Sequence, residues 1–504
     1  MAYSLGQKSG FTGTKTKSNI TSPQSGMCSL CNEGCEGPCE IGLAAVMGKQ
    51  TVYPLTTGPN QIASEKNYPL DFSCFNINGR VFGAEGVPAD TQHAQIFNVD
   101  LTREYGTFNP VKLKLPILLP ALIKMNWEDY FSGAAMAGVS CVIGEDAKDK
   151  DPNLIVKNGR IIDFPFLEKV LDSFSRYYRG YGQIVLQSNL SDDQLGVPEI
   201  ALEKYKVEAI EIKFGQGAKG IQPVKRLKDI EAARKRKLFG EIVSPDPDSE
   251  QTIKAYKEGV SPSFYSYAKL PQWDETKLKK RIKDLRDQGA KNIYFKMAGY
   301  DIKDIERVLN IASKEKVDMV TFDGAGGGSG YSPCKMMNEW SLPTVNLEAE
   351  VCKIVSKLQQ KGMFVPSLTI TGGFASEDQV FKALCLGEGN FTAIGLGRSA
   401  MASAMVGKEV GNLIKAGKTP KRYSQYGSSI EEIFGDLPDL RAIYGKKANL
   451  FSPGAIGVFS YLNKIGFGLQ HFSALNRKFN LNLLNRSDLI PLTQAAKEIL
   501  MKNS

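Results

Sequence analysis

The stretch Thr321-Phe-Asp-Gly-Ala-Gly-Gly-Gly-Ser-Gly-Tyr-Ser-Pro333 is the part of the sequence that decides the fold. It continues a short apolar run that predicts a buried strand ending at Asp323, and five of the next seven residues are glycine. Glycine leaves out the side chain where the backbone must come close to another group. Two further strand-to-glycine transitions follow, at Ser367–Gly373 and at Phe391–Arg398.

These three glycine segments predict a phosphate-binding region. Glycines at the carboxyl ends of successive parallel strands expose backbone N–H groups, which form an anion-binding nest. The alternative is that each glycine only closes a turn, but three such transitions in one chain favour the binding interpretation. The candidate cofactor-binding residues of these segments are Asp323, Gly324, Gly327, Gly328, Gly372, Gly373, Gly395, Gly397 and Arg398.

Short apolar runs alternate with helix-length amphipathic stretches from Pro116 onward, which is typical of repeated βα units. Eight such units predict an α/β fold of the (β/α)8 TIM-barrel type. Helices are expected at Asp274–Arg286 and Asp301–Lys314. Between the fourth and fifth strands, Arg234–Gly259 is interpreted as an excursion over the C-terminal face of the barrel. The predicted strands are Ile117–Ala121, Val139–Gly144, Ile184–Ser188, Ala209–Phe214, Asn292–Met297, Asp318–Asp323, Ser367–Thr371 and Thr392–Gly395.

The predicted domain organisation has three parts. Residues 1–110 form an N-terminal segment, residues 111–425 form the barrel, and residues 426–504 form a helical C-terminal extension. The extension is expected to begin near Ser428-Ser-Ile-Glu-Glu, where serine and glutamate suit a helix start. The apolar stretch Phe451–Gln470 contains Lys464 and is expected to pack against the barrel.

Composition excludes several classes of protein. The chain has 504 residues, of which 42% are hydrophobic and 23% charged, as expected for a soluble globular protein. Its net charge of +9 comes from scattered lysines and arginines. A nucleic-acid-binding protein would be expected to have a clustered basic stripe with aromatic residues, and the sequence has none. No apolar segment is long enough to span a membrane, and no secretory signal is visible. We therefore expect a cytoplasmic protein.

Four of the nine cysteines are clustered, at Cys28, Cys31, Cys35 and Cys39. A pair of disulfides is disfavoured in a cytosolic chain, and zinc more often takes two CxxC pairs separated by a longer loop. Compressed four-cysteine runs are more typical of iron–sulfur ligation. We interpret these residues as ligands of a [4Fe–4S] cluster, with structural zinc as the alternative. The other cysteines are expected in the core, with a position facing the cofactor pocket as the alternative for Cys334: Cys74, Cys141, Cys334, Cys352 and Cys385.

Histidine chemistry is excluded at the barrel ends. The chain has two histidines, His93 and His471, and neither lies at a predicted strand end. Mechanisms that need a Ser-His-Asp or Cys-His arrangement therefore lack their base. Because barrel active sites lie at the carboxyl ends of the strands, the candidate polar residues are those that follow each strand. These are Glu145, Asp146, Gln187, Lys213, Gln216, Lys219, Lys296 and Asp323.

Two segments together resemble a known family. The segment DGAGGGSGYSP, beginning at Asp323, is similar to the GHDGGTGASP segment of the FMN-binding domain of glutamate synthase. The segment Glu211-Ile-Lys-Phe-Gly-Gln-Gly-Ala-Lys219 resembles that family's EIK-xx-QGAK segment. The resemblance extends over roughly residues 110–410. The cysteine segment separately resembles the N-terminal cluster motif of carbon monoxide dehydrogenases.

The resemblance implies roles for particular residues. Lys296 would stabilise the negative charge of reduced FMN, and the glycines of the last two transitions with Arg398 would hold the FMN phosphate. Gly144, Glu145 and Gln187 match cofactor-contacting positions. The catalytic residues implied on the substrate side are Lys213, Gln216 and Lys219, together with Lys296.

The same resemblance implies a flavin-dependent oxidoreductase that reduces an imine or a 2-oxo acid, by default 2-oxoglutarate with ammonia. Electrons would pass from the iron–sulfur cluster to FMN, supplied by a donor such as ferredoxin or a reductase subunit, and the protein would be an oligomer. The alternatives are an amine–glutamate transferase of the N-methylglutamate synthase type and a non-catalytic electron-transfer subunit.

The substrate side departs from the family pattern. The family's PGEGG is replaced by Gly220-Ile-Gln-Pro-Val, its HHD by Ser263-Phe-Tyr-Ser-Tyr, and the histidine and aspartate of its glycine loop by Ala325 and Gly326. No cysteine cluster follows Gly397, and no glutaminase domain is expected at the N-terminus. FMN is therefore a firmer expectation than 2-oxoglutarate.

Overall fold

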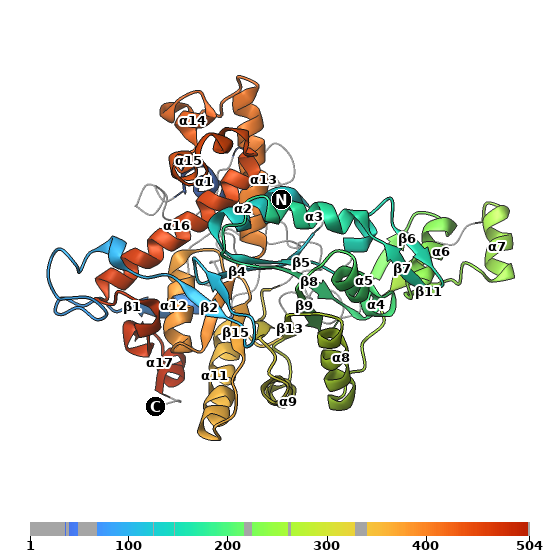
Figure 1. The fold of residues 1–504 in the computed structure, drawn as a ribbon, viewed down its shortest axis with the longest axis horizontal. Helices are drawn as coiled ribbons and strands as arrows, with labels where there is room; N and C mark the ends of the chain where they lie inside the picture. Colours follow the sequence, from blue (N-terminus) through green and yellow to red (C-terminus); the bar gives the residue numbers. More distant parts are fainter. Residues whose placement is uncertain are drawn as a thin grey trace.

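The computed structural model describes residues 36, 40–48, 68–123, 125–145, 147–215, 224–260, 264–327 and 340–501. Its centre is a closed barrel of eight parallel strands surrounded by helices, which confirms the predicted (β/α)8 fold (Figure 1). The strands, in chain order, are β4 (Ile117–Leu122), β5 (Ser140–Ile143), β8 (Ile184–Ser188), β9 (Ala209–Lys213), β13 (Asn292–Ala298), β14 (Met319–Asp323), β15 (Ser367–Thr371) and β16 (Phe391–Gly395).

All eight predicted strands are present, and their bounds differ from the prediction by about one residue at either end. The first strand closes the barrel against the last, because Ile394 and Gly395 pair with Ile117 and Leu118 in parallel register. Every residue of β14 is buried, as its apolar sequence predicts. Helices cover the outer face of each barrel strand, and side chains fill the barrel on its inner face. Residues on both faces of a strand are therefore buried.

Helices connect the strands and pack with their apolar faces against the barrel. In α8, Leu278, Ile282 and Leu285 are buried at a spacing of one helical turn, and Asp274 caps the first turn through Lys277 N. The connecting helices are α2 (Trp127–Ala137), α3 (Pro165–Ser175), α4 (Leu190–Gln194), α5 (Val197–Glu203), α8 (Glu275–Asp287), α9 (Ile302–Lys314), α11 (Thr344–Gln360), α12 (Glu377–Gly387) and α13 (Arg398–Lys415). A hairpin of β6 (Ile155–Lys157) and β7 (Arg160–Asp163) precedes α3.

The amino-terminal end of the barrel is closed by an apolar plug. A hairpin of β2 (Arg103–Tyr105) and β3 (Val111–Leu113) covers this end. Tyr105 contacts Tyr294 with ring centroids 5.8 Å apart, and its hydroxyl lies 2.6 Å from Ser140 Oγ. The buried residues of the plug are Tyr105, Leu113, Leu118, Val142, Val185, Ala209, Tyr294, Met319 and Ala393.

An excursion is present between the fourth and fifth strands, where one over the C-terminal face was predicted, and its elements extend away from the barrel (Figure 1). Its antiparallel sheet has the order β10-β12-β11. A small apolar cluster of its own, centred on Ile230, Ala233 and Phe264, holds it together. Its elements are β10 (Val224–Leu227), α6 (Ile230–Leu238), β11 (Ile242–Ser244), α7 (Glu250–Lys257) and β12 (Phe264–Tyr267).

Described segments from the N-terminal and C-terminal parts of the sequence pack together outside the barrel. Strand β1 (Phe75–Ile77) pairs antiparallel with β17 (Leu489–Pro491), and a buried helix, α1 (Glu40–Met47), packs against α13 and α16 (Pro453–Leu475). The sequence did not predict α1, because its neighbourhood reads as polar and loop-rich. The remaining helices are α14 (Ile430–Ile433), α15 (Leu437–Tyr444) and α17 (Gln494–Met501).

Two local expectations for the C-terminal part of the chain agree with the structure: the helix start near Ser428 and the packing of Phe451–Gln470. Ser429 and Glu432 form a reciprocal capping box at the start of α14. Helix α16 packs against α13, α2 and α12 of the barrel layer, with Lys464 buried beside Glu377. Among the helices that the structure describes, none combines the length and apolar character that a membrane span needs.

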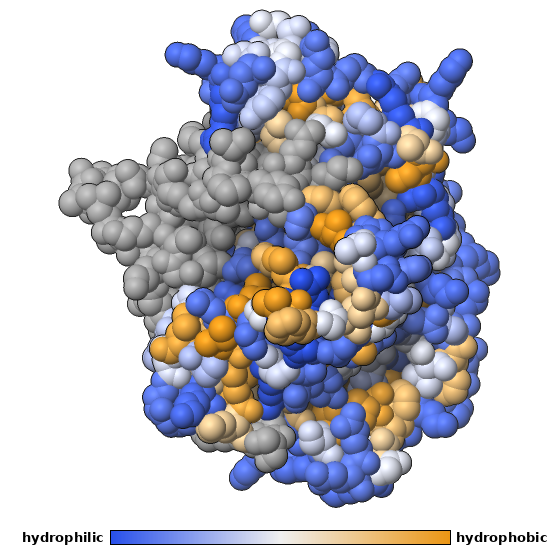
Figure 2. Space-filling model, turned by 90° about the vertical axis from the view of Figure 1, so that its left-hand side faces the viewer, coloured by the Kyte–Doolittle hydropathy of each residue, from blue (hydrophilic) through white to orange (hydrophobic). Residues whose placement is uncertain are grey.

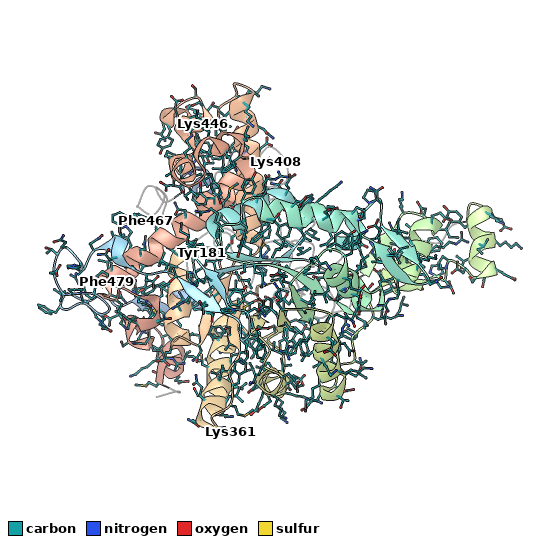
Figure 3. All side chains as sticks on the ribbon, in the orientation of Figure 1. Tyr181, Lys361, Lys408, Lys446, Phe467 and Phe479 are labelled. Atoms are coloured by element: carbon teal, nitrogen blue, oxygen red, sulfur yellow. The ribbon has the colours of Figure 1, made fainter. Side chains whose placement is uncertain are left out.

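Apolar side chains gather on the surface where these N-terminal and C-terminal segments pack together. Figure 2 shows this face of the molecule, with apolar surface among polar residues. Phe467 of α16, labelled in Figure 3, lies 6.4 Å from the ring of Phe97 and 4.8 Å from that of His471. Phe479, also labelled there, is buried. Exposed apolar residues of this region include Val81, Phe82, Phe97 and Leu475.

Candidate active site

The glycines that follow β14 and β15 come together at the carboxyl end of the barrel. Gly372 and Gly373 have φ angles of +135° and +90°. A Cβ atom on Gly372 would lie 2.3 Å from Thr344 Oγ1 and 3.2 Å from the Cα atom of Gly324. The backbone N–H of Gly324 donates to the carbonyl of Thr371 at 2.9 Å. The two loops therefore leave no room for side chains at Gly324 and Gly372.

The third glycine segment joins the same region. A Cβ atom on Gly395 would lie 2.3 Å from Thr371 Cγ2, and Gly397 directly precedes α13. The guanidinium of Arg398 donates to the carbonyl of Gly326 at 2.5 Å, which ties α13 to the loop after β14. The first N–H groups of a helix carry partial positive charge and bind anions. We call Gly324, Gly372, Gly373, Gly395 and Gly397 the glycine cradle; with Arg398 it can hold a phosphate.

Side chains and backbone are also closely packed next to the cradle. Thr371 Oγ1 donates to Asp323 Oδ1 at 2.6 Å, and both side chains are buried. A Cβ atom on Gly327 would overlap Asp323 Oδ1, at 1.8 Å. Across the barrel, a Cβ atom on Gly144 would lie 3.2 Å from the backbone carbon of Leu122. These glycines are required by close approach of neighbouring atoms.

Two lysines face one cavity at the carboxyl end. Lys213 and Lys296 are direct neighbours in the register of β9 and β13. Together with Asp323 they line a cavity of about 230 Å³ that continues between α8 and α9. The outer wall includes Trp273, Tyr300, Leu278, Arg307 and Val308. Burial raises the pKa of Tyr300 to about 12, so its hydroxyl stays neutral and can donate a hydrogen bond.

The two lysines differ in their partners. Lys213 forms a salt bridge with Glu145, and only 8% and 16% of these side chains are exposed. No described carboxylate lies within salt-bridge distance of Lys296. The positive charge of Lys213 is therefore offset within the protein, whereas that of Lys296 is directed toward the cavity and the barrel interior.

One layer below the lysines, the barrel interior is polar. Gln187 of β8 and Glu211 of β9 are buried, and Gln187 Nε2 donates to Glu211 Oε1. Burial raises the pKa of Glu211, and the nearby charge of Lys296 is the largest influence that lowers it. Sequence reasoning named Gln187 but missed Glu211. The available signal was a charged residue within a buried strand, two positions before Lys213.

Sequence reasoning also missed two threonines that hold the loops. Thr344, the first residue of α11, donates to the carbonyl of Gly372 at 2.8 Å. Thr371 contacts Asp323 and lies against Gly395, as described above. Threonine at a strand end or helix start gives no functional pattern in a sequence, so only their positions in the fold identify them.

Several predicted residues lie outside the part of the chain that the structure describes. These are Asp146, Gln216, Lys219, Gly328 and Cys334, together with the proposed cluster ligands Cys28, Cys31, Cys35 and Cys39. Of the other cysteines, Cys141, Cys352 and Cys385 are buried as expected, and Cys74 is partly buried.

The sequence matches a known family over the part of the barrel that forms this site. Residues 179–407 match the family model described as the conserved region in glutamate synthase. This range contains six barrel strands, β8, β9 and β13–β16, and the whole glycine cradle. The conserved region of that family therefore includes the glycine cradle, Lys213 and Lys296.

One curated relative is similar over part of its length. Over 200 residues the chain is 28% identical to the archaeal-type glutamate synthase (NADPH) of Dehalococcoides mccartyi. The similar region covers 38% of this chain and 35% of that protein, so the chain spans about a third of the relative's length.

Solved structures with a similar arrangement have little sequence identity. One is the recombinant flavin-binding domain of flavocytochrome b2 from baker's yeast, with 12% identity and a TM-score of 0.46, covering 86% of this chain and 78% of that one. Another is a putative lactate oxidase from Pediococcus acidilactici, with 12% identity and a TM-score of 0.43, covering 96% and 99%. At these TM-scores neither structure contributes to the assignment.

Proposed function

We propose that this protein binds FMN at the carboxyl end of the barrel and reduces an imine or a 2-oxo acid, by default 2-oxoglutarate with ammonia. The observation that carries the proposal is the convergence of three glycine segments and the α13 N-terminus beside a cavity lined by Lys296. FMN would supply the transfer of a hydride to the substrate carbon.

The glycine cradle fits the FMN phosphate. It offers backbone N–H groups without side chains, and the N-terminus of α13 adds its partial positive charge. Arg398 holds the loop after β14 in place through Gly326 and adds a full positive charge. Phosphate sites after the seventh and eighth strands recur in barrels of this type. Gly144, Gln187 and Asp323 are assigned to the isoalloxazine side of the site.

Lys296 has the role of a fixed positive charge beside the flavin ring. Because no described carboxylate pairs with it, its charge is available to stabilise negative charge that develops on reduction. Lys213 is held by Glu145 at the edge of the cavity. In the proposal, Lys213 binds a carboxylate of the oxo acid, and Gln216 and Lys219 contribute from the segment that follows.

Electrons would reach the flavin from a [4Fe–4S] cluster held by Cys28, Cys31, Cys35 and Cys39. Helix α1, which begins directly after Cys39, packs against α13 and α16. A Cβ atom on Gly457 of α16 would lie 3.5 Å from the Cβ atom of Ala45. The cysteine motif is thus covalently attached to a helix that contacts α13, the helix whose first residue borders the cradle. An electron donor such as ferredoxin, a cytoplasmic location and an oligomeric state complete the proposal.

The flavin assignment is tested by analysing the purified protein. We expect yellow-brown protein that releases FMN when it is denatured, identified by chromatography and fluorescence. The variant Gly372→Ala should lose FMN, because its Cβ would overlap Thr344 Oγ1, whereas Gly289→Ala, where no atom lies within 4 Å, provides a control for replacing a glycine of positive φ. Colourless protein that no flavin reconstitutes would end the proposal.

The cluster is tested by metal analysis of anaerobic protein. About four irons per chain are expected for a [4Fe–4S] centre with four cysteine ligands. Cys31→Ser or Cys35→Ser should abolish iron binding and leave FMN bound, because the cradle is built from other segments. Cys74→Ser is the matched control, since Cys74 lies outside the motif. Stoichiometric zinc would contradict the iron–sulfur assignment.

The substrate is tested by mixing reduced enzyme anaerobically with 2-oxo acids, with and without ammonia, while flavin absorbance is recorded. Fast reoxidation by 2-oxoglutarate only when ammonia is present would support the default reaction. Lys219→Ala should abolish this reoxidation and retain FMN. Reoxidation by an unrelated acceptor alone would reject the glutamate assignment and leave the flavin assignment standing.

A further inference from the structure

The polar layer inside the barrel contains oxygens without hydrogen-bond partners among the described residues. They are Gln187 Oε1, Glu211 Oε2 and Thr321 Oγ1, and all three residues are 1% exposed. The register places Glu211 beside Gln187 on β8 and beside Tyr294 on β13. Unpartnered buried oxygens are costly, so a group that persists in this state points to a function.

Glu211 and Gln187 are arranged to accept one more proton. When Glu211 is ionised, it accepts one hydrogen bond from Gln187, in which Gln187 Nε2 donates to Glu211 Oε1. The two remaining oxygens of the pair, Glu211 Oε2 and Gln187 Oε1, are both acceptors. A proton on Glu211 Oε2 would provide the missing donor within the same pair of side chains.

The charge of Glu211 depends on Lys296. Burial raises the pKa of Glu211, while Lys296, the hydrogen bond from Gln187 and Lys213 lower it; Glu145 raises it. Tyr294, which faces Glu211 from β13, has its own pKa raised well above its usual value by burial and is neutral. Lys213 is already paired with Glu145. Lys296 is therefore the main charged group whose influence on the pKa of Glu211 can change when a charge appears nearby.

We propose that Glu211 is the proton acceptor that accompanies reduction of the bound flavin. The inference rests on the proposed function, because it needs FMN beside Lys296. FMN held beside Lys296 would, once a one-electron donor has supplied two electrons, carry one added proton and one negative charge. Lys296 then pairs with that charge, and the second proton binds the Glu211 carboxylate at Oε2. Two electrons and two protons are taken up, and the net charge of the site is unchanged.

The physical reason is charge balance in a buried site. A reduced flavin with one negative charge, an ionised Glu211 and a single unpaired lysine would leave excess negative charge where water is excluded. Protonation of Glu211 removes that charge and adds a hydrogen-bond donor to a pair of side chains that has two unpartnered acceptors. Glu211 acts by holding a proton next to the flavin and is not assigned to the substrate.

The experiment counts protons during reduction of the FMN-loaded protein. Weakly buffered protein with a pH-indicator dye is reduced by reduced methyl viologen, which delivers electrons without protons, and flavin absorbance reports the electrons taken up. About two protons per flavin are expected in the wild type and about one in Glu211→Gln, because linked uptake equals the difference in bound protons between the two states. The control Glu348→Gln, which replaces a buried glutamate of α11 outside the barrel, should leave the count unchanged.

Infrared difference spectra of the wild type provide a second measurement that does not depend on a variant. Reduced-minus-oxidised spectra should show the carbonyl stretch of a newly protonated carboxyl, absent in Glu211→Gln and retained in Glu348→Gln. Equal proton counts in wild type and Glu211→Gln, or no carboxyl band in the wild type, would overturn the inference while bound FMN keeps the proposed function intact. Protein that binds no FMN would overturn both.

Discussion

The two ends of the barrel are built on opposite principles. The amino-terminal end is filled by apolar and aromatic side chains around Tyr105 and Tyr294 and closed by a hairpin. The carboxyl end contains Glu211, Lys213 and Lys296 in a region with unpartnered oxygens and an open cavity. The same eight strands pass through both ends, so the difference comes from the side chains that alternate inward along each strand.

The comparison teaches where stability and function are placed. Buried apolar side chains stabilise the fold in proportion to the area they remove from water, whereas buried charges cost free energy unless they are paired. Substitutions at the amino-terminal end should therefore change unfolding and leave cofactor chemistry unaffected. Substitutions at the carboxyl end should mainly do the reverse.

The largest expected effect is at the apolar end. Tyr294→Ala should lower the free energy of unfolding by about 4 kcal/mol, because it removes a fully buried ring and leaves a cavity. Denaturant unfolding measures the loss. Tyr294→Phe is the matched control and should lose about 1 kcal/mol, since it removes only the hydrogen bond to Gln183 Oε1. Loss of FMN from folded Tyr294→Ala protein would contradict the separation of the two ends.

The second effect is at the carboxyl end and concerns rate. Lys296→Met should slow flavin reduction about 100-fold, because it removes the unpaired charge that stabilises negative charge on reduction. Stopped-flow absorbance with a one-electron donor measures the rate. Lys303→Met, an exposed lysine at the start of α9, is the control and should reduce at the wild-type rate. An unchanged rate in Lys296→Met would remove Lys296 from the mechanism.

The third effect links the polar layer to pH. The pKa of Glu211 is raised above its ordinary value of 4.5 by burial, so the folded state keeps a proton that the unfolded state releases. As pH rises from 4.5 to the folded-state pKa, the wild type should lose up to about 1.4 kcal/mol of stability per pH unit through this group. Glu211→Gln lacks this loss. The free energy of unfolding of the variant, relative to that of the wild type, should therefore increase across this pH window and stay constant above it.

Thermal unfolding of the FMN-free proteins across pH provides the measurement. Glu348→Gln should also become more stable relative to the wild type as pH rises, because burial raises the pKa of Glu348 well above its usual value. The pH dependence thus reports burial of a carboxyl group, whereas the proton count described above reports its coupling to flavin. Parallel stability profiles for wild type and Glu211→Gln would contradict the raised pKa.

The smallest effect is at the loop contacts. Thr371→Val should lower stability by about 1 kcal/mol, because it removes the hydrogen bond to Asp323 Oδ1 while keeping the side-chain shape. Denaturant unfolding and FMN titration together measure it, with Thr369→Val, one layer deeper, as the control. A weaker FMN affinity in Thr371→Val alone would show that Asp323 orients the cofactor side of the site.

Much of the fold could be predicted from the sequence because its signals are local. The apolar run before Asp323 and the glycines after it identify a buried strand and a turn without reference to any other part of the chain. Alternation of such strands with amphipathic helices, as at Leu278, Ile282 and Leu285, then limits the fold to a closed parallel barrel. The glycine cradle was predicted for the same reason.

Only the tertiary structure decided which of these residues meet. Lys213 and Lys296 look equivalent at the ends of two strands, and the salt bridge from Lys213 to Glu145, in the turn after β5, distinguishes them. Glu211 became notable because Gln187, 24 positions away in sequence, is its buried partner. The sequence alone determines which side chains are present and their local periodicity. Which side chains contact each other, and which are buried, depends on strand register, and packing over the whole barrel sets that register.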